Sequence, residues 1–159
     1  MSGLVKRKFF KRFTTPLVDE FTYTLPTGVT IAWIEVIGGG GSGGGGDNAG
    51  GNSSTGGGGG AGAAMSWGVF DAPSLGTLTL WIADGGAAPN VRTVGDLGGT
   101  TYVANSSGKV ICRAYGGGGG APSTGDSRSD GGGGGGTGSP GGLGAEDTAG
   151  DGGNPTLQG

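Results

Sequence analysis

The side chains that most often carry enzyme chemistry are scarce in this sequence. Among its 159 residues there is no histidine, and Cys112 is the single cysteine. A histidine-dependent catalytic triad, a histidine-ligated metal, a cysteine-pair zinc site and an intramolecular disulfide are therefore excluded within one chain. Cys112 alternates with the apolar residues Val110 and Ala114, which predicts a buried, unreactive thiol on a strand.

The carboxylates form no pattern of a catalytic pair. The twelve Asp and Glu residues are spread thinly, and the adjacent pairs Asp19-Glu20 and Glu146-Asp147 are typical of solvated loop acids. The sequence Gly108-Lys109-Val110 lacks the hydroxyl that a phosphate-binding loop places after its lysine. We therefore expect no enzymatic activity, no metal and no cofactor.

The basic side chains are concentrated near the N-terminus. The net charge is −3, but residues 1–13 carry five basic residues and no acid, and the rest of the chain holds four basic and twelve acidic residues. This predicts a basic arm, residues 1–15, that anchors an acidic body, residues 16–159, to a larger assembly. The anchoring residues would be Lys6, Arg7, Lys8, Phe9, Phe10, Lys11, Arg12 and Phe13.

Three other interpretations of the arm remain open. Its basic residues are suited to nucleic-acid phosphates and its phenylalanines to stacking on bases. An aromatic and basic segment is also typical of binding to a membrane surface. Finally, the arm is compatible with a tail that has no role. Docking on a protein assembly is the interpretation that we favour over these.

Glycine dominates the composition of the body. The chain holds 46 glycines, about four times the usual share. Residues 38–62 contain 16 glycines in 25 positions, and residues 116–159 contain 20 in 44. Between these glycine blocks the composition has β character, with β-branched and aromatic residues in short alternating runs.

The apolar runs predict an all-β domain with little or no helix. The expected strands cover residues 21–25, 29–37, 65–70, 75–82, 100–103 and 109–115, and residues 105–108 predict a hairpin turn. Both faces of residues 29–37 are apolar, because Ile31, Trp33 and Ile37 alternate with other apolar side chains. We therefore expect this strand to be covered on both sides.

The glycine blocks have two interpretations. One is a flexible linker, as for glycine- and serine-rich sequence in general. The other is an ordered layer of polyglycine-II segments, which have three residues per turn and no internal hydrogen bonds, so that they must bond to their neighbours. Strands enter the glycine runs without a break, and this favours the ordered layer. Since ordering glycine is costly, self-association is expected to help, with a trimer favoured.

Two stretches of the sequence have a pattern of their own: Phe21-Thr22-Tyr23-Thr24-Leu25-Pro26-Thr27-Gly28-Val29-Thr30 and the strand-to-glycine junction Ile34-Glu35-Val36-Ile37-Gly38. Through these stretches the sequence resembles, over about residues 19–145, the glycine-rich domains of bacteriophage tail fibres and related virion proteins. It implies a non-enzymatic structural or receptor-binding domain on a phage particle. In some phage adhesins of similar composition, loops between polyglycine helices touch the host receptor.

These observations lead to one expected function and one alternative. We expect a phage virion surface protein of fibre, spike or head-fibre type, made in the host cytoplasm without a signal peptide or membrane span, whose basic arm binds other virion proteins. Loops between the glycine runs would contact the host receptor, through Asn48, Asn52, Ser123, Asp126, Arg128 and Asp130. The alternative is a capsid decoration protein that binds no receptor.

Overall fold

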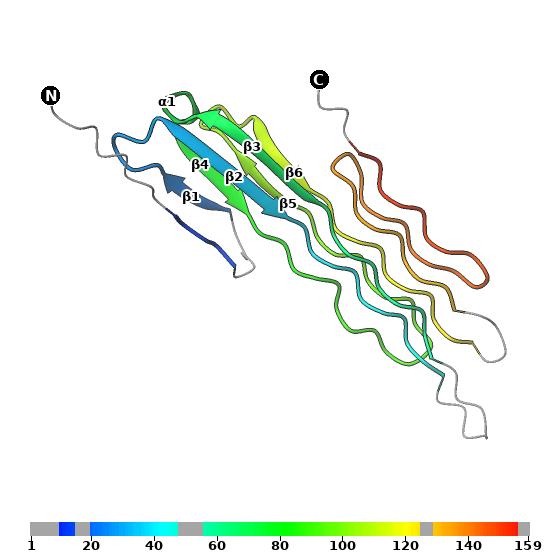
Figure 1. Cartoon of the computed structure of the whole chain (residues 1–159). Helices are drawn as coiled ribbons and strands as arrows, with labels where there is room; N and C mark the ends of the chain where they lie inside the picture. Colours follow the sequence, from blue (N-terminus) through cyan, green and yellow to red (C-terminus); the bar gives the residue numbers. More distant parts are fainter. Residues whose placement is uncertain (1–9, 15–19, 48–55, 125–128, 156–159) are drawn as a thin grey trace, which may run out of the picture.

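The protein consists of a small β domain from which a bundle of glycine-rich segments extends (Figure 1). The computed structural model describes residues 10–14, 20–47, 56–124 and 129–155. The elements are β1 (Phe21–Thr24), β2 (Ile31–Ile37), β3 (Met65–Asp71), α1 (Ala72–Leu75), β4 (Thr77–Trp81), β5 (Thr101–Ala104) and β6 (Val110–Ala114). The predicted all-β class is confirmed.

The strands form two antiparallel sheets. One has four strands in the order β1-β4-β5-β6, and the other is the two-stranded pair β2-β3. The predicted turn at residues 105–108 connects β5 to β6. There the side-chain oxygen of Asn105 accepts hydrogen bonds from the N–H groups of Ser107 and Lys109, and Gly108 has a φ of 78°.

A single-turn helix, α1, was not expected from the sequence. Asp71 ends β3 and caps this helix, because its carboxylate accepts a hydrogen bond from the N–H of Ser74. Pro73 lies in the first turn, where its missing N–H costs no hydrogen bond. Gly76 then ends the turn with a φ of 63°, which leads the chain directly into β4.

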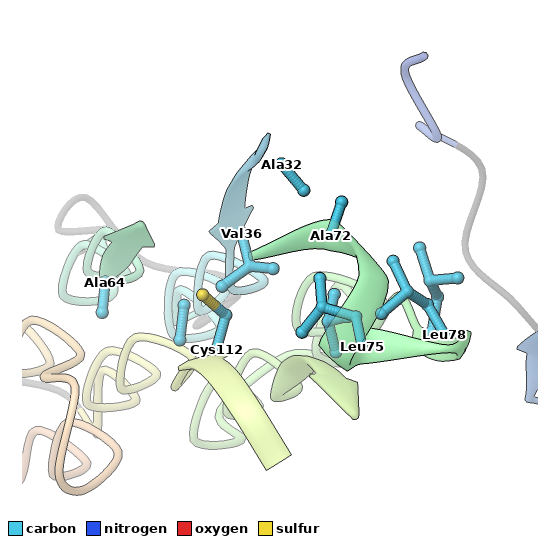
Figure 2. Packing of buried hydrophobic residues seen from close by; sticks show 10 residues of the cluster. Ala32, Val36, Ala64, Ala72, Leu75, Leu78 and Cys112 are labelled. Carbon is cyan, nitrogen blue, oxygen red and sulfur yellow. The ribbon is translucent and has the colours of Figure 1, made fainter. Parts of the chain in front are cut away.

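The core lies between the two sheets and is built from small side chains. Figure 2 shows Val36 of β2 and Cys112 of β6 next to each other, with Leu75 and Leu78 farther along the same layer. The Cys112 thiol is buried, as predicted, and lies 3.9 Å from the carbonyl oxygen of Ile34. Burial raises the pKa of this thiol and so favours its neutral form.

The expectation that β2 is covered on both sides is wrong for the single chain. Ala32 and Val36 are buried against the other sheet, but Ile31, Trp33 and Ile37 are exposed on the opposite face. The reason is that β2 pairs only with β3, and no described segment of the chain packs over the outer face of this pair.

The glycine-rich segments continue the strands without a change of register. Ile37 pairs with Met65 at the end of the β2-β3 ladder, and the next N–H, that of Gly38, donates to the carbonyl of Ala64 at 3.1 Å. The pairing then continues along the same two segments, with donation from Gly41 to Ala61 and from Gly44 to Gly58. Beyond β5 and β6, Gly98 and Gly95 donate in the same manner to Gly117 and Gly120. The β2-β3 pair and the β5-β6 pair therefore each anchor one end of a pair of glycine segments.

The hydrogen bonds in these segments recur at every third residue. In segment 38–47, Gly38, Gly41 and Gly44 donate to one neighbour, while Gly39, Ser42 and Gly45 donate to another, segment 93–99. A period of three is that of the polyglycine-II conformation, whereas a β ladder would repeat with period two. The described parts of the glycine blocks are therefore ordered polyglycine-II segments and not linkers.

Segments that continue different sheets bond directly to one another in this bundle. Gly117, Gly120 and Ser123, which follow β6, donate to Gly39, Ser42 and Gly45, which follow β2. In the β domain, core side chains separate β2 from β6, as in any pair of stacked sheets. Where the strands give way to glycine there are no side chains between the layers. The backbones therefore come together, and backbone hydrogen bonds take the place of the apolar core.

Segment 115–123 lies at the centre of the bundle. Gly116 to Gly120, Ala121 and Ser123 are all buried. This segment exchanges backbone hydrogen bonds with the neighbours that surround it, which are 38–47, 56–64, 93–99, 130–136 and 139–144. A Cβ on Gly118 would overlap the carbonyl oxygen of Gly142, so only glycine permits this spacing.

Two adjacent glycines allow the packing of the bundle to be tested. A Cβ on Gly58 would overlap the carbonyl oxygen of Asp130, whereas a Cβ on Gly59 would meet no atom within 4 Å. Gly58→Ala is expected to lower the free energy of unfolding by about 1–3 kcal/mol or more through overpacking. Gly59→Ala is expected to leave it unchanged or raise it by up to about 1 kcal/mol, because alanine restricts the unfolded chain. Denaturant titration measures both, and equal effects would contradict the bundle.

The buried thiol provides a second test. Cys112 is expected to react with a thiol-specific disulfide reagent at the rate of unfolding and not at the rate of a free thiol, because burial blocks access and its raised pKa disfavours the thiolate. The raised pKa also makes the free energy of unfolding depend on pH. The contribution of Cys112 is fully present below the ordinary thiol pKa of about 8.5 and is lost as pH rises from there through the raised pKa of the folded protein. Rapid labelling of the folded protein at neutral pH would contradict the core described above.

Candidate functional site

The described part of the basic arm is attached to the edge of the β domain. Phe13 packs against Phe21 and Tyr23 of β1, with ring centroids 5.5 and 5.4 Å apart. The ammonium of Lys11 lies 5.4 Å from the centroid of the Phe13 ring, and Phe10 is almost fully exposed. Of the predicted anchoring residues, Lys6, Arg7, Lys8 and Phe9 lie outside the described residues.

The opposite end of the molecule is the far end of the glycine bundle. Figure 1 shows the segments after β2, β4 and β6 running away from the strands, and the segment after β4 turns back at the far end. We call this end the bundle tip; its described polar side chains include Asp47, Asn90, Arg92, Thr124 and Glu146. The described part of the arm, residues 10–14, and the bundle tip therefore lie at opposite ends of the protein (Figure 1).

An ion pair holds one side of the bundle tip. The Nε of Arg92 donates to Oδ1 of Asp47 at 2.6 Å, and the terminal guanidinium nitrogen Nη2 lies 2.5 Å from the same oxygen. The Asp47 side chain is only 2% exposed, so the guanidinium, itself 54% exposed, offsets the cost of burying a carboxylate. Arg92 has a φ of 56°, in the left-handed region, and its N–H donates to the carbonyl of Gly46.

Sequence reasoning did not find this ion pair. Asp47 and Arg92 are 45 positions apart, and neither belongs to a motif. The available signal was weak: Arg92 is one of only four basic residues outside the arm, and Asp47 directly ends a glycine run.

Polar contacts also connect neighbouring segments on the other side of the bundle tip. The hydroxyl of Thr124 donates to the carboxylate of Glu146, and Ser129 forms an isolated backbone bridge with Glu146. The hydroxyl of Ser129 donates to the carbonyl of Pro122 at 2.9 Å. The bundle tip thus combines an ordered backbone with exposed polar groups.

The predicted receptor contacts have different positions. Asn48, Asn52, Asp126 and Arg128 lie outside the described residues. Asp130 is partly exposed at the bundle tip, where its carbonyl accepts a hydrogen bond from the N–H of Ala121. Ser123 is completely buried and its N–H donates to the carbonyl of Gly45, so in the single chain it packs inside the bundle and is not a surface contact.

The shifted titratable groups lie in the β domain, away from the bundle tip. The pKa of Tyr102 on β5 is raised, mainly because its hydroxyl donates a hydrogen bond to the carboxylate of Glu20. Among the described residues, no three Cys, Asp or Glu side chains gather as a metal site would require. The same part of the chain contains no helix long and apolar enough to cross a membrane.

Comparison with known proteins identifies the family. The sequence model of the family described as "Glycine-rich domain" matches residues 14–159, which covers the whole body and the last two residues of the basic arm. The chain therefore belongs to the glycine-rich domain family. No match was found among curated proteins or among solved structures.

The ion pair at the bundle tip can be tested with a double-mutant cycle. Arg92→Ala leaves the Asp47 carboxylate buried without its partner and is expected to lower the free energy of unfolding by about 1–3 kcal/mol. Asp47→Asn should remove most of the effect of the Arg92 substitution, because no charge is then left unpaired. Additive effects in urea titrations of the three variants would contradict a coupled pair.

Proposed function

We propose that the protein is a bacteriophage virion surface protein of fibre, spike or head-fibre type. In this proposal the basic arm anchors it to other virion proteins of the capsid or tail, and the glycine bundle projects outward for attachment to the host. The observation that carries the proposal is that the described part of the arm, residues 10–14, and the bundle tip lie at opposite ends of the molecule (Figure 1). A protein that links a particle to a cell needs two separate ends of this kind.

The charge distribution supports separate roles for the two ends. The arm carries five positive charges in thirteen residues, while the remainder of the chain has an excess of eight acids over basic residues. A basic segment suits an acidic groove on a large assembly, where it would become ordered on binding. Contact of the arm with packaged nucleic acid is the less favoured version of the same proposal.

The bundle supports a presenting role. Its lateral hydrogen bonds hold the turns at the bundle tip, and rigid scaffolds commonly present binding loops in this manner. The resemblance to phage adhesins, whose loops between polyglycine helices touch the receptor, agrees with the bundle geometry. The proposed receptor contacts are Asp130 at the bundle tip and Asn48, Asn52, Asp126 and Arg128, which lie outside the described residues. We propose a homotrimer as the functional form.

The anchoring role predicts a loss of incorporation when the arm is neutralised. Lys6, Arg7, Lys8, Lys11 and Arg12 would be changed to Gln, while Phe13 is kept because it packs on β1. The number of copies per purified particle, counted by quantitative mass spectrometry, is expected to fall to background with the fold unchanged by circular dichroism. Lys11→Gln with Arg12→Gln should reduce incorporation more than the matched pair Lys109→Gln with Arg113→Gln. Undiminished incorporation would contradict anchoring by the arm.

The attachment role is tested by adsorption competition. Purified protein, incubated with the cells that the particle infects, should block phage adsorption in a dose-dependent manner. Alanine substitution of Asn48, Asn52, Asp126, Arg128 and Asp130 should abolish the block, whereas Lys109→Ala, next to the β5-β6 turn at the other end, should retain it. Absence of a block by folded wild-type protein would contradict attachment and would favour a capsid decoration protein.

A further inference from the structure

We infer that the outer face of the β2-β3 pair is the surface through which copies of this chain associate. The β2-β3 outer face consists of the side chains that alternate outward along the two strands: Ile31, Trp33, Glu35, Ile37, Met65, Trp67, Val69 and Asp71. The inference rests on the proposed trimer but not on anchoring or receptor attachment, so these can fail separately.

The apolar side chains of the β2-β3 outer face are ordered against one another but are not covered. Trp33 and Trp67 stack across the two strands, with ring centroids 5.0 Å apart and an angle of 15° between the ring planes. Trp33 nevertheless remains 64% exposed and Trp67 50% exposed. Ile31, Ile37, Met65 and Val69 are each more than half exposed beside them. A continuous apolar surface of this kind is unusual for a side of a protein that faces water.

The apolar area of this surface matches that of a specific protein interface. The six large apolar side chains present roughly 450 Å², if a fully exposed tryptophan offers about 200 Å² and a fully exposed aliphatic side chain about 100 Å². One partner in a standard interface buries about 800 Å², of which about 57% is non-polar. The β2-β3 outer face therefore has the apolar area that stable association requires.

The arm of the same chain does not cover this face where the structure describes it. Phe13 packs on Phe21 and Tyr23 of β1, and β1 lies at the edge of the other sheet. The charged residues of the face, Glu35 and Asp71, are both acidic. A face with acids and no basic residue is unsuited to nucleic acid or to an anionic membrane.

The equivalent face of another copy fits this surface best. It has the same two-stranded apolar shape, and in a trimer three such faces would meet around the three-fold axis, each in contact with the other two. Closed symmetry repeats the same patch on every subunit, so association around an axis would bury all copies of it together. The contact would also give β2 the apolar cover on both sides that its sequence predicts.

The test compares two valines of nearly equal exposure. Val69 lies on the β2-β3 outer face and is 56% exposed, while Val91 lies at the turn of the bundle tip and is 55% exposed. Wild type and Val91→Glu are expected to sediment at the same multiple of the 15.0 kDa chain mass, three-fold for a trimer. Val69→Glu places a charge in the contact and is expected to sediment as a monomer with an unchanged circular dichroism spectrum.

Fluorescence quenching of the wild-type protein tests the same face without a substitution. Acrylamide should quench Trp33 and Trp67 poorly in the concentrated protein and efficiently after dilution to the monomer, with the variant Trp33→Phe, Trp67→Phe giving the contribution of Trp81 alone. A wild-type protein that is monomeric at all concentrations, or a Val69→Glu variant that remains associated, would overturn the inference. A monomer whose Trp33 and Trp67 become protected only in assembled particles would also overturn it and assign the face to another virion protein.

Discussion

Direct hydrogen bonding between glycine segments is the interaction on which the rest of this structure depends. In the β domain two sheets are held apart by Val36, Cys112 and their neighbours, whereas a few residues farther along the same strands the layers meet and bond backbone to backbone. The change occurs where the side chains end, at Gly38 after β2 and at Gly116 after β6. A Cβ at Gly41 or Gly118 would overlap a carbonyl oxygen of the adjacent segment, so the bundle excludes larger residues at these positions.

Ordering so many glycines is costly, and the strands reduce that cost. Glycine loses more conformational freedom on folding than any other residue. Segments 38–47 and 56–64 begin already paired, because the β2-β3 ladder sets their register up to the first hydrogen bond between Gly38 and Ala64. The β5-β6 pair does the same for segments 93–99 and 115–123. The β domain therefore sets the register in which the glycine segments pair. Association through the β2-β3 outer face would stabilise this β domain.

The strands could be predicted from the sequence, because alternation and turn residues are local signals: the pattern of Thr77 and Thr79 between leucines and the turn at Asn105 both correspond to the structure. The polyglycine-II conformation, with its period of three, could also be predicted, because strands enter the glycine runs without a break. The partners of each glycine segment could not, since one glycine run carries no information that distinguishes it from another. The exposure of Trp33 was missed because both faces of β2 are apolar and the sequence does not show which face the other sheet covers. The Asp47–Arg92 ion pair could be predicted only if the alignment of the segments in the bundle were already known.

The bundle accounts for the glycine-rich composition of this chain and agrees with its membership of the glycine-rich domain family. The central claim is that the glycine blocks are an ordered polyglycine-II bundle, and amide hydrogen exchange tests it most directly. The account predicts that the N–H groups of Gly117, Gly118 and Gly120, which donate to Gly39, Gly133 and Ser42 inside the bundle, exchange as slowly as those of β5 and β6. Exchange of these amides at the rate of an unstructured chain, with β5 and β6 protected, would contradict it.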